Sequence, residues 1–260
     1  MKEIKALEQL LGEGYAFGPV PRIRKNTWLN RYVDYIRDEI KENNKFKPSF
    51  LFQGIKNELR EKCPNPAYYS GTHTIMINSK EALFHELVHA YTRNRNPELY
   101  EKGTKLRETF FVRLVNGNLS RKDVENMIIS NSVIEGIAYY LEGEYRNQAV
   151  KPGTKLNGLS DIEANSFYES GEKLTQGFLK ISTEDRAEKR EKILKGIKLL
   201  DEYTARVGYY LARSWCEAHP ECSRGMIIDN LIQEPPYDVK DLQEIILHNM
   251  KISANLKNSF

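Results

Sequence analysis

The sequence has few cysteines and lacks any long hydrophobic run. Its 260 residues include three cysteines, Cys63, Cys216 and Cys222, and no C-x-x-C pair. Three are too few for a disulfide framework. Cys216 and Cys222 are close enough in sequence to bridge, but we expect free buried thiols, as in a reducing compartment. No segment approaches the roughly 20 apolar residues that a membrane span requires, so no membrane partner is predicted.

The first residues also lack the pattern of a secretory signal. Residues 1–18 (MKEIKALEQLLGEGYAFG) contain no uninterrupted apolar run and no small-residue cleavage site. An excess charge of one sign is missing as well, because 39 basic residues face 36 acidic ones and the net charge is +3. A broad basic surface for nucleic acid is therefore not expected. Together these absences predict a cytoplasmic protein without a nucleic-acid or membrane partner.

What the sequence does contain is the composition of a folded domain, and the elements predicted along it indicate the α+β class. Apolar residues make up 40% of the chain, which is enough to fill one core at this length. We expect a single domain, 1–260, in which a small N-terminal mixed sheet (1–78) packs on a predominantly helical C-terminal part (79–260). Within the first part, we expect a helix at 27–40 and extended segments at 49–52, 67–69 and 72–78.

The second part shows helical periodicity almost throughout. One predicted helix, 121–146, has a possible break at Ser130-Asn131-Ser132, and another, 184–218, is expected to have one or more breaks. Asn78 followed by Glu81 resembles a capping box for the predicted helix at 80–94. The full set of helices is predicted at 80–94, 98–116, 121–146, 161–180, 184–218, 223–232 and 238–250.

Two of the five histidines form the motif H-E-L-V-H at 85–89. On a helix, His85 and His89 lie one turn apart, about 6 Å along the axis, beside an apolar stripe. Both imidazoles can therefore reach one zinc ion, which binds histidine nitrogens at about 2.0–2.1 Å. Glu86, next to His85, can take a proton from water at such an ion. The alternative is a pair of surface histidines on an ordinary helix, but the strand and the apolar stripe around the motif favour a metal site.

A catalytic zinc needs a third protein ligand. The histidine-rich extension of the metzincins is absent, because Thr92 and Arg95 stand where its glycine and its third histidine would be. In SVIEGIAYYLEGEY (132–145), apolar residues repeat the spacing found around the histidine motif, so that Glu135 occupies the register of His85. Gly136 beside it would permit a close approach of the two helix backbones.

The segments HELVH (85–89) and EGIAYYLE (135–142) resemble the two motifs of the gluzincin metallopeptidases. In the zinc aminopeptidases of that family, the second motif reads N-E-G-F-A-x-Y-x-E. The resemblance implies one zinc ion per chain, with His85, His89 and Glu135 as ligands and Glu86 as the general base. It also implies a zincin-like fold, in which the sheet forms the upper wall of a cleft and the helices complete the site below. A weaker resemblance to prokaryotic zincin-like proteins continues through 207–215 and 226–248.

The spacing between the two motifs departs from the family. Thermolysin-like enzymes and the aminopeptidases have a shorter segment, which would place the ligand at Glu108 in KLRETFF (105–111). Glu135 is preferred because its whole neighbourhood matches, whereas Glu108 has only the spacing. Thermolysin-like enzymes also have an aspartate four residues after the ligand glutamate, and Tyr139 stands there in this chain. The contact that orients a ligand histidine must then come from elsewhere, and Glu142 is a candidate.

The resulting prediction is a zinc metallopeptidase that hydrolyses peptide or protein substrates, with endopeptidase action as the default because the G-x-M-E-N motif of the aminopeptidases is absent. Strand 72–78 is expected to be an edge that binds an extended peptide by strand addition. Tyr209 or Tyr210 could donate a hydrogen bond to the oxyanion, although both also fit a role in the core.

Two alternatives stay open at this point. One is a non-proteolytic zincin-fold protein with a structural zinc or with a cleft that binds a peptide or a partner. The other is a latent protease in which a segment of roughly the first 25 residues blocks the cleft. No pattern in the sequence indicates the oligomeric state or the cleavage specificity.

Overall fold

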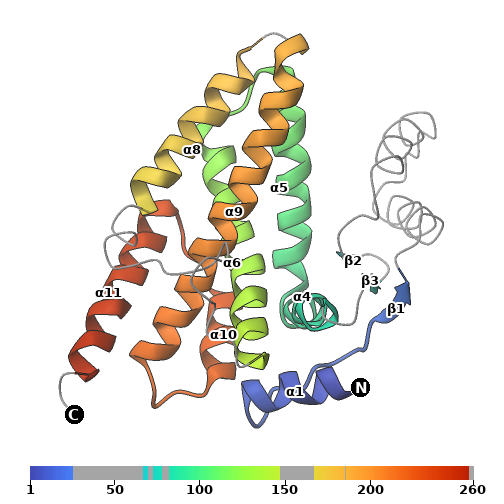
Figure 1. Ribbon diagram of the computed structural model, residues 1–260, viewed down its shortest axis with the longest axis vertical. Helices are drawn as coiled ribbons and strands as arrows, with labels where there is room; N and C mark the ends of the chain where they lie inside the picture. Colours follow the sequence, from blue (N-terminus) through green and yellow to red (C-terminus); the bar gives the residue numbers. More distant parts are fainter. Residues whose placement is uncertain (26–66, 70–72, 78–81, 147–166, 185, 258–260) are drawn as a thin grey trace.

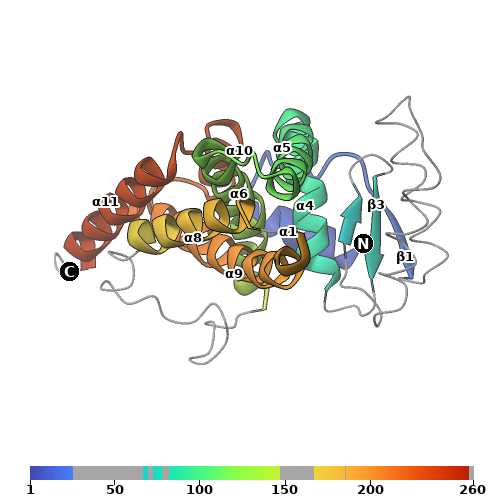
Figure 2. The same cartoon turned by 90° about the horizontal axis from the view of Figure 1, so that it is seen from above.

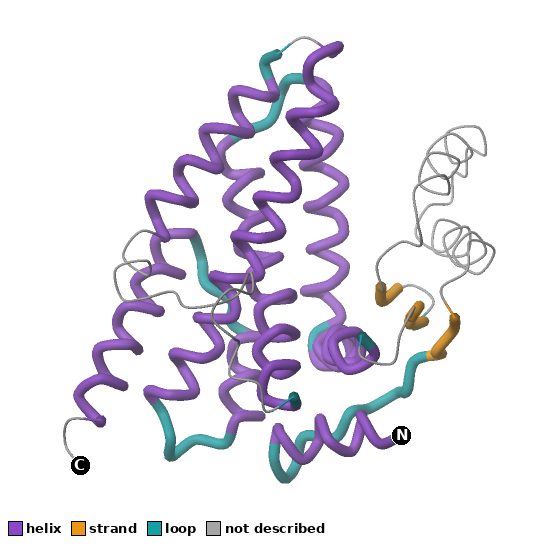
Figure 3. The backbone as a smooth tube through the Cα atoms, in the orientation of Figure 1, coloured by secondary structure: helices purple, strands orange, loops and turns teal. Residues whose placement is uncertain are grey.

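The protein is mainly helical and carries one small sheet, as the computed structural model shows (Figures 1 and 3). The structure describes residues 1–25, 67–69, 73–77, 82–146, 167–184 and 186–257. The elements in chain order are α1 (Lys2–Leu11), β1 (Arg22–Lys25), β2 (Ala67–Tyr69), β3 (Thr74–Ile77), α4 (Leu83–Arg95), α5 (Pro97–Asn116), α6 (Arg121–Tyr145), α8 (Phe167–Ser182), α9 (Arg186–Ala218), α10 (Arg224–Gln233) and α11 (Val239–Lys257). The predicted α+β class is confirmed. The predicted helix at 27–40 and the predicted strand at 49–52 lie outside the described residues.

The sheet is mixed and has the strand order β1-β3-β2. β2 and β3 run antiparallel with Tyr68 opposite Ile75, as expected for a hairpin, and β1 pairs with β3 in parallel. The prediction that 72–78 is an edge strand is therefore wrong, because both sides of β3 are already paired. Its central position explains why Thr74, Ile75 and Met76 are all buried. Strand addition can take place only at β1 or β2 among the three described strands.

Helix α4 lies between the sheet and the helical part. In two perpendicular views, the strands lie on one side of α4, and the long helices α6, α8, α9 and α11 lie on the other side (Figures 1 and 2). Of the ten residues from Leu83 to Thr92 in α4, all except His85 are buried. An amphipathic helix buries one face, whereas a helix with cover on both sides is buried around most of its circumference. The position of α4 thus accounts for its burial.

The closest helix crossing in the core joins α6 to α9. A Cβ atom at Gly136 would lie 2.1 Å from the carbonyl carbon of Gly208, and a Cβ atom at Gly208 would lie 1.7 Å from the carbonyl oxygen of Ser132. Only glycine fits at such a contact. The close approach predicted for Gly136 exists, but its partner is α9 and not the histidine-bearing helix, which corrects the prediction.

Several predicted helix boundaries need correction. α6 continues without a break through Ser130, Asn131 and Ser132, whose side chains are buried. α9 is likewise one helix from Arg186 to Ala218. The predicted capping residues of α4, at 78 and 81, lie outside the described residues, and α4 begins at Leu83 without a side-chain cap. α11 ends at Lys257, seven residues after the predicted end at 250. Residues 161–166, the predicted start of the helix that contains α8, lie outside the described residues. The other boundaries agree with the prediction within three residues.

The first 25 residues belong to the fold. α1, which the sequence analysis does not predict, buries Ile4, Leu7 and Leu11 in the main hydrophobic core together with residues of α4, α6 and α10. Phe17, which follows it, is also buried, and β1 adds a strand to the sheet. The residues that the latent-protease alternative treats as a cover for the cleft thus include residues of the hydrophobic core. None of the described helices is both long and apolar enough to cross a membrane.

Candidate metal centre

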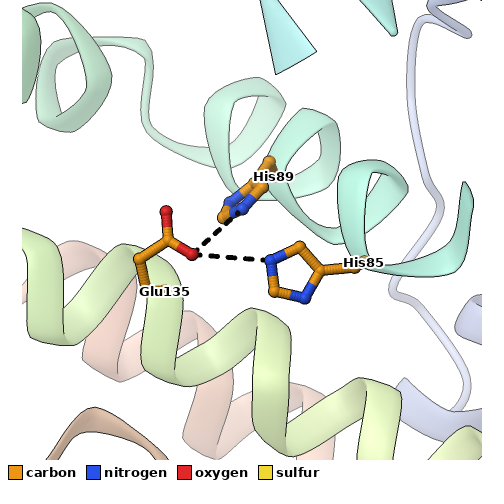
Figure 4. A group of neighbouring side chains, drawn as sticks. All are labelled: His85, His89 and Glu135. Carbon is orange, nitrogen blue, oxygen red and sulfur yellow. Dashed lines mark ion pairs between the residues drawn. The ribbon is translucent and has the colours of Figure 1, made fainter. Parts of the chain in front are cut away.

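The two motif histidines and Glu135 meet between α4 and α6. The Nε2 atom of His85 lies 3.4 Å from Oε2 of Glu135, and the Nε2 atom of His89 lies 3.6 Å from the same oxygen (Figure 4). The two histidine side chains are only 13% and 9% exposed, and the Glu135 side chain is 34% exposed. The structure thus brings together all three residues predicted as ligands, from two helices far apart in the sequence.

The spacing of the three ligand atoms fits one small cation. They all lie within 4.8 Å of one another. In a tetrahedral zinc site with ligands at about 2.1 Å, neighbouring ligand atoms are roughly 3.4 Å apart. The two distances from Glu135 Oε2 are close to that value. Two imidazole nitrogens and one carboxylate oxygen are also the ligand types of catalytic zinc sites, which leave a fourth position open.

Glu142 orients His85 from the side opposite Glu135. Its Oε2 atom lies 3.1 Å from Nδ1 of His85, so this nitrogen donates a hydrogen bond and Nε2 is the atom that faces Glu135. Arg146, one turn further along α6, pairs with the other oxygen of Glu142 at 2.5 Å. Glu142 therefore makes the contact with His85 for which the sequence analysis considers it. It lies two helical turns after Glu135, whereas the aspartate of thermolysin-like enzymes lies one turn after the ligand glutamate.

The histidines and the carboxylates strongly shift one another's pKa values. Burial lowers the pKa of His85, but hydrogen bonds with Glu135 and Glu142 outweigh it and raise that pKa to about 10. Burial likewise opposes the charge of Glu135, yet His89 and His85 hold its pKa well below the usual range. Without a metal ion, His85 therefore carries a proton at neutral pH. A cation that binds Nε2 must displace this proton, since only the neutral imidazole is a ligand.

Glu86 lies at the same site and is 5% exposed. Burial raises its pKa, and the two histidines partly oppose this shift. Its carboxylate accepts a hydrogen bond from the main-chain N–H of Tyr68 on β2. This contact links the sheet to the helix that carries both histidines, and it puts the predicted general base at the boundary between them.

Three tyrosines line the site, and the sequence analysis names only one of them there. The ring of Tyr139 meets that of His85 edge-on with the centroids 4.6 Å apart. Tyr100 lies next to His89 at 6.4 Å, and Tyr68 lies next to Tyr100 at 6.0 Å. Tyr100 follows H-E-L-V-H closely in the chain, but its spacing carries no signal that distinguishes it from an ordinary core residue of α5.

Other predicted candidates do not join this cluster. Tyr209 and Tyr210 are buried, and their rings pack against Tyr140 and Phe167, which supports their role in the core. Glu108 falls within α5, but its side chain lies outside the described residues. The described cysteines, Cys216 and Cys222, are free thiols as predicted, but they are only partly buried. Cys63 lies outside the described residues.

His73 has a structural contact with two parts of the chain. It has a φ of 48°, a region that residues other than glycine rarely adopt. Its Nε2 lies 2.8 Å from the carbonyl oxygen of Pro19, and its Nδ1 lies 2.7 Å from the Tyr68 hydroxyl. Because the carbonyl can only accept, Nε2 donates, and in the neutral ring Nδ1 accepts from the hydroxyl. His73 thereby joins the start of β3 to β2 and to the segment before β1.

Comparison of the chain with known protein families, with curated proteins and with solved structures finds no match. The resemblance to the gluzincins depends on sequence motifs alone and stays a prediction.

Proposed function

We propose that this protein is a zinc-dependent metallopeptidase of the gluzincin type, with His85, His89 and Glu135 as the zinc ligands. The observation that carries the proposal is the convergence of both histidine Nε2 atoms on one oxygen of Glu135, at 3.4 and 3.6 Å. This ligand set and its spacing correspond to a catalytic zinc site with one open position. A zinc ion bound there would supply Lewis acidity, which makes water more acidic and polarises a carbonyl group.

Glu86 is the proposed general base. It lies beside the ligand histidines, and burial raises its pKa toward the range in which a carboxylate can accept and release protons. Glu86 takes a proton from the attacking water and passes it to the nitrogen of the leaving amine. The side chain of Glu142 keeps His85 in the tautomer that presents Nε2 to the site.

A zincin-like arrangement is part of the proposal. The sheet and the helical part lie on opposite sides of the histidine-bearing helix (Figure 2). β2 forms one edge of the described sheet and approaches Glu86 through the main-chain N–H of Tyr68. An extended peptide substrate would therefore pair with β2, and not with β3 as the sequence suggests. The substrates would be peptides or proteins.

A non-proteolytic role is the second candidate, and one observation favours it. The Glu86 carboxylate already accepts a hydrogen bond from Tyr68, so it is anchored to the sheet. An anchored carboxylate suits a structural zinc site that ties the sheet to the helices. In that case, the cleft would bind a peptide or a partner without cleaving it.

Replacing Glu86 by glutamine separates the two candidates. We expect Glu86→Gln to keep one zinc ion per chain and to lower the hydrolysis of unfolded casein by about 10²- to 10⁴-fold, because the amide cannot accept the proton. The exposed Glu101 of α5 provides the matched control, Glu101→Gln, which should keep both properties. Retained hydrolysis in Glu86→Gln would rule out the assigned base. A wild-type protein that binds zinc and cleaves no unfolded protein would favour the non-proteolytic role.

A further inference from the structure

The hydroxyl group of Tyr100 is buried beside the candidate metal centre and has no hydrogen-bond partner in the described part of the chain. Its ring packs edge-on against His89 on one side and against Tyr68 on the other, with centroid distances of 6.4 and 6.0 Å. A buried hydroxyl without a partner is costly and calls for an explanation. The position of this group at the metal centre suggests that it acquires its partner there.

The nearest charged groups identify that partner. Two carboxylates, those of Glu135 and Glu86, lie close enough to the Tyr100 hydroxyl to act on it electrostatically. A phenol hydroxyl can donate a hydrogen bond, and a carboxylate accepts one. Glu86 already accepts from the main chain of Tyr68, which leaves Glu135 as the carboxylate that the Tyr100 hydroxyl would serve.

Glu135 has one oxygen available. Its Oε2 atom faces both histidines, and its other oxygen points away from them (Figure 4). In metal sites, a carboxylate ligand is usually held by an outer hydrogen bond, as His85 is held by Glu142 in this protein. Without such a bond, the side chain of Glu135 can rotate away from the ion.

We propose that Tyr100 is a positioning residue of the metal centre, whose hydroxyl donates a hydrogen bond to the second oxygen of Glu135 when Glu135 binds the ion. This inference rests on the proposed zinc site but not on proteolysis. The outer contacts would then be divided between two helices, with Glu142 of α6 holding His85 and Tyr100 of α5 holding Glu135.

The test compares Tyr100→Phe with a matched control. Tyr91 on α4 also has a buried hydroxyl without a partner in the described part of the chain, but its surroundings are Asp229, Arg95 and Tyr15. Zinc affinity is measured by competition with a chromophoric chelator. We expect Tyr100→Phe to bind zinc roughly 10- to 100-fold more weakly and Tyr91→Phe to keep the wild-type affinity.

A second readout distinguishes positioning from packing. Cobalt replaces zinc, and its absorption spectrum reports the ligand geometry; we expect a changed spectrum in Tyr100→Phe and the wild-type spectrum in Tyr91→Phe. Unchanged zinc affinity and cobalt spectrum in Tyr100→Phe would overturn the inference. If that variant does not fold, the ultraviolet absorption of the tyrosines is measured in the wild type while zinc is added. A new hydrogen bond from a buried phenol shifts this absorption. The absence of a shift would contradict the inference.

The outcome is separable from that of the proposed function. If the wild-type protein binds no zinc, the proposed site and the inference fail together. If the wild type binds zinc and Tyr100→Phe binds it equally well, only the inference fails. Zinc binding without proteolysis, together with weak binding by Tyr100→Phe, would support the inference and contradict the peptidase proposal.

Discussion

The contact between Glu142 and His85 determines which imidazole nitrogen faces the other ligands. His85 uses Nδ1 for Glu142 and Nε2 for Glu135, so that both histidines present the same atom to the site. Thermolysin-like enzymes would supply the orienting carboxylate one turn after the ligand glutamate, where this chain has Tyr139. A side chain two turns away on the same helix also faces α4, because seven residues nearly complete two turns.

Glu142 can be tested by its effect on zinc binding. Glu142→Ala should weaken zinc binding about tenfold or more, because His85 loses the acceptor that fixes its ring and its tautomer. Competition with a chelator measures the affinity. Glu125→Ala is a suitable control, since it removes the same charge from α6 at a residue that pairs with Arg121. Equal affinities in the two variants would show that the contact does not position the histidine.

The residues of the site were predictable to different degrees. His85 and His89 follow from their spacing on one helix, and Glu135 follows from the periodicity that it shares with them. Tyr100 could not be found in this way, because periodicity shows which face of a helix is apolar but not which neighbouring helix that face meets. Its place beside His89 depends on how α5 packs after the short connection at Asn96.

At the level of elements, the crossing of α6 and α9 holds Glu135, the proposed ligand, in place. Glu135 precedes Gly136, and the backbone of Gly136 touches that of Gly208. A side chain at either glycine would push the helices apart and would move Glu135 relative to α4. The sequence indicated that Gly136 serves a close approach, but the identity of the partner helix depends on tertiary packing.

Gly208→Ala tests this crossing. The added methyl group would overlap the carbonyl oxygen of Ser132, so we expect a loss of stability of about 3 kcal/mol, at the upper end of the usual range for overpacking. Gly177→Ala on α8 is the control, because nothing lies within 4 Å of a Cβ atom there. That change should stabilise the protein by roughly 0.5–1 kcal/mol. Chemical denaturation measures both values, and similar stabilities would contradict the described crossing.

The elements that the sequence analysis missed depend on partners far away in the chain. β1 is four residues long and pairs with β3, about 50 residues later, so its own sequence gives little signal. The parallel pairing with β1 also explains why β3 is not the predicted edge strand. The long helices were predictable because their periodicity extends over many residues.

At the scale of the whole molecule, the candidate metal centre lies where the sheet, α4 and the helical part come together. The sheet approaches Glu86, α4 provides both histidines, and α6 provides Glu135 and Glu142. α1 packs in the main core together with residues of α4, the helix that carries both histidines. A zinc ion at this point would tie two distant parts of the chain and stabilise the folded state.

The most direct test of the account is the zinc content of the wild-type protein beside Glu135→Ala and Glu108→Ala, determined by elemental analysis after dialysis. We predict one zinc ion per chain in the wild type and in Glu108→Ala, and a loss of zinc in Glu135→Ala, because the latter removes the oxygen that faces both histidines. Zinc that is lost only with Glu108, or a wild-type protein without zinc, would contradict the proposed centre.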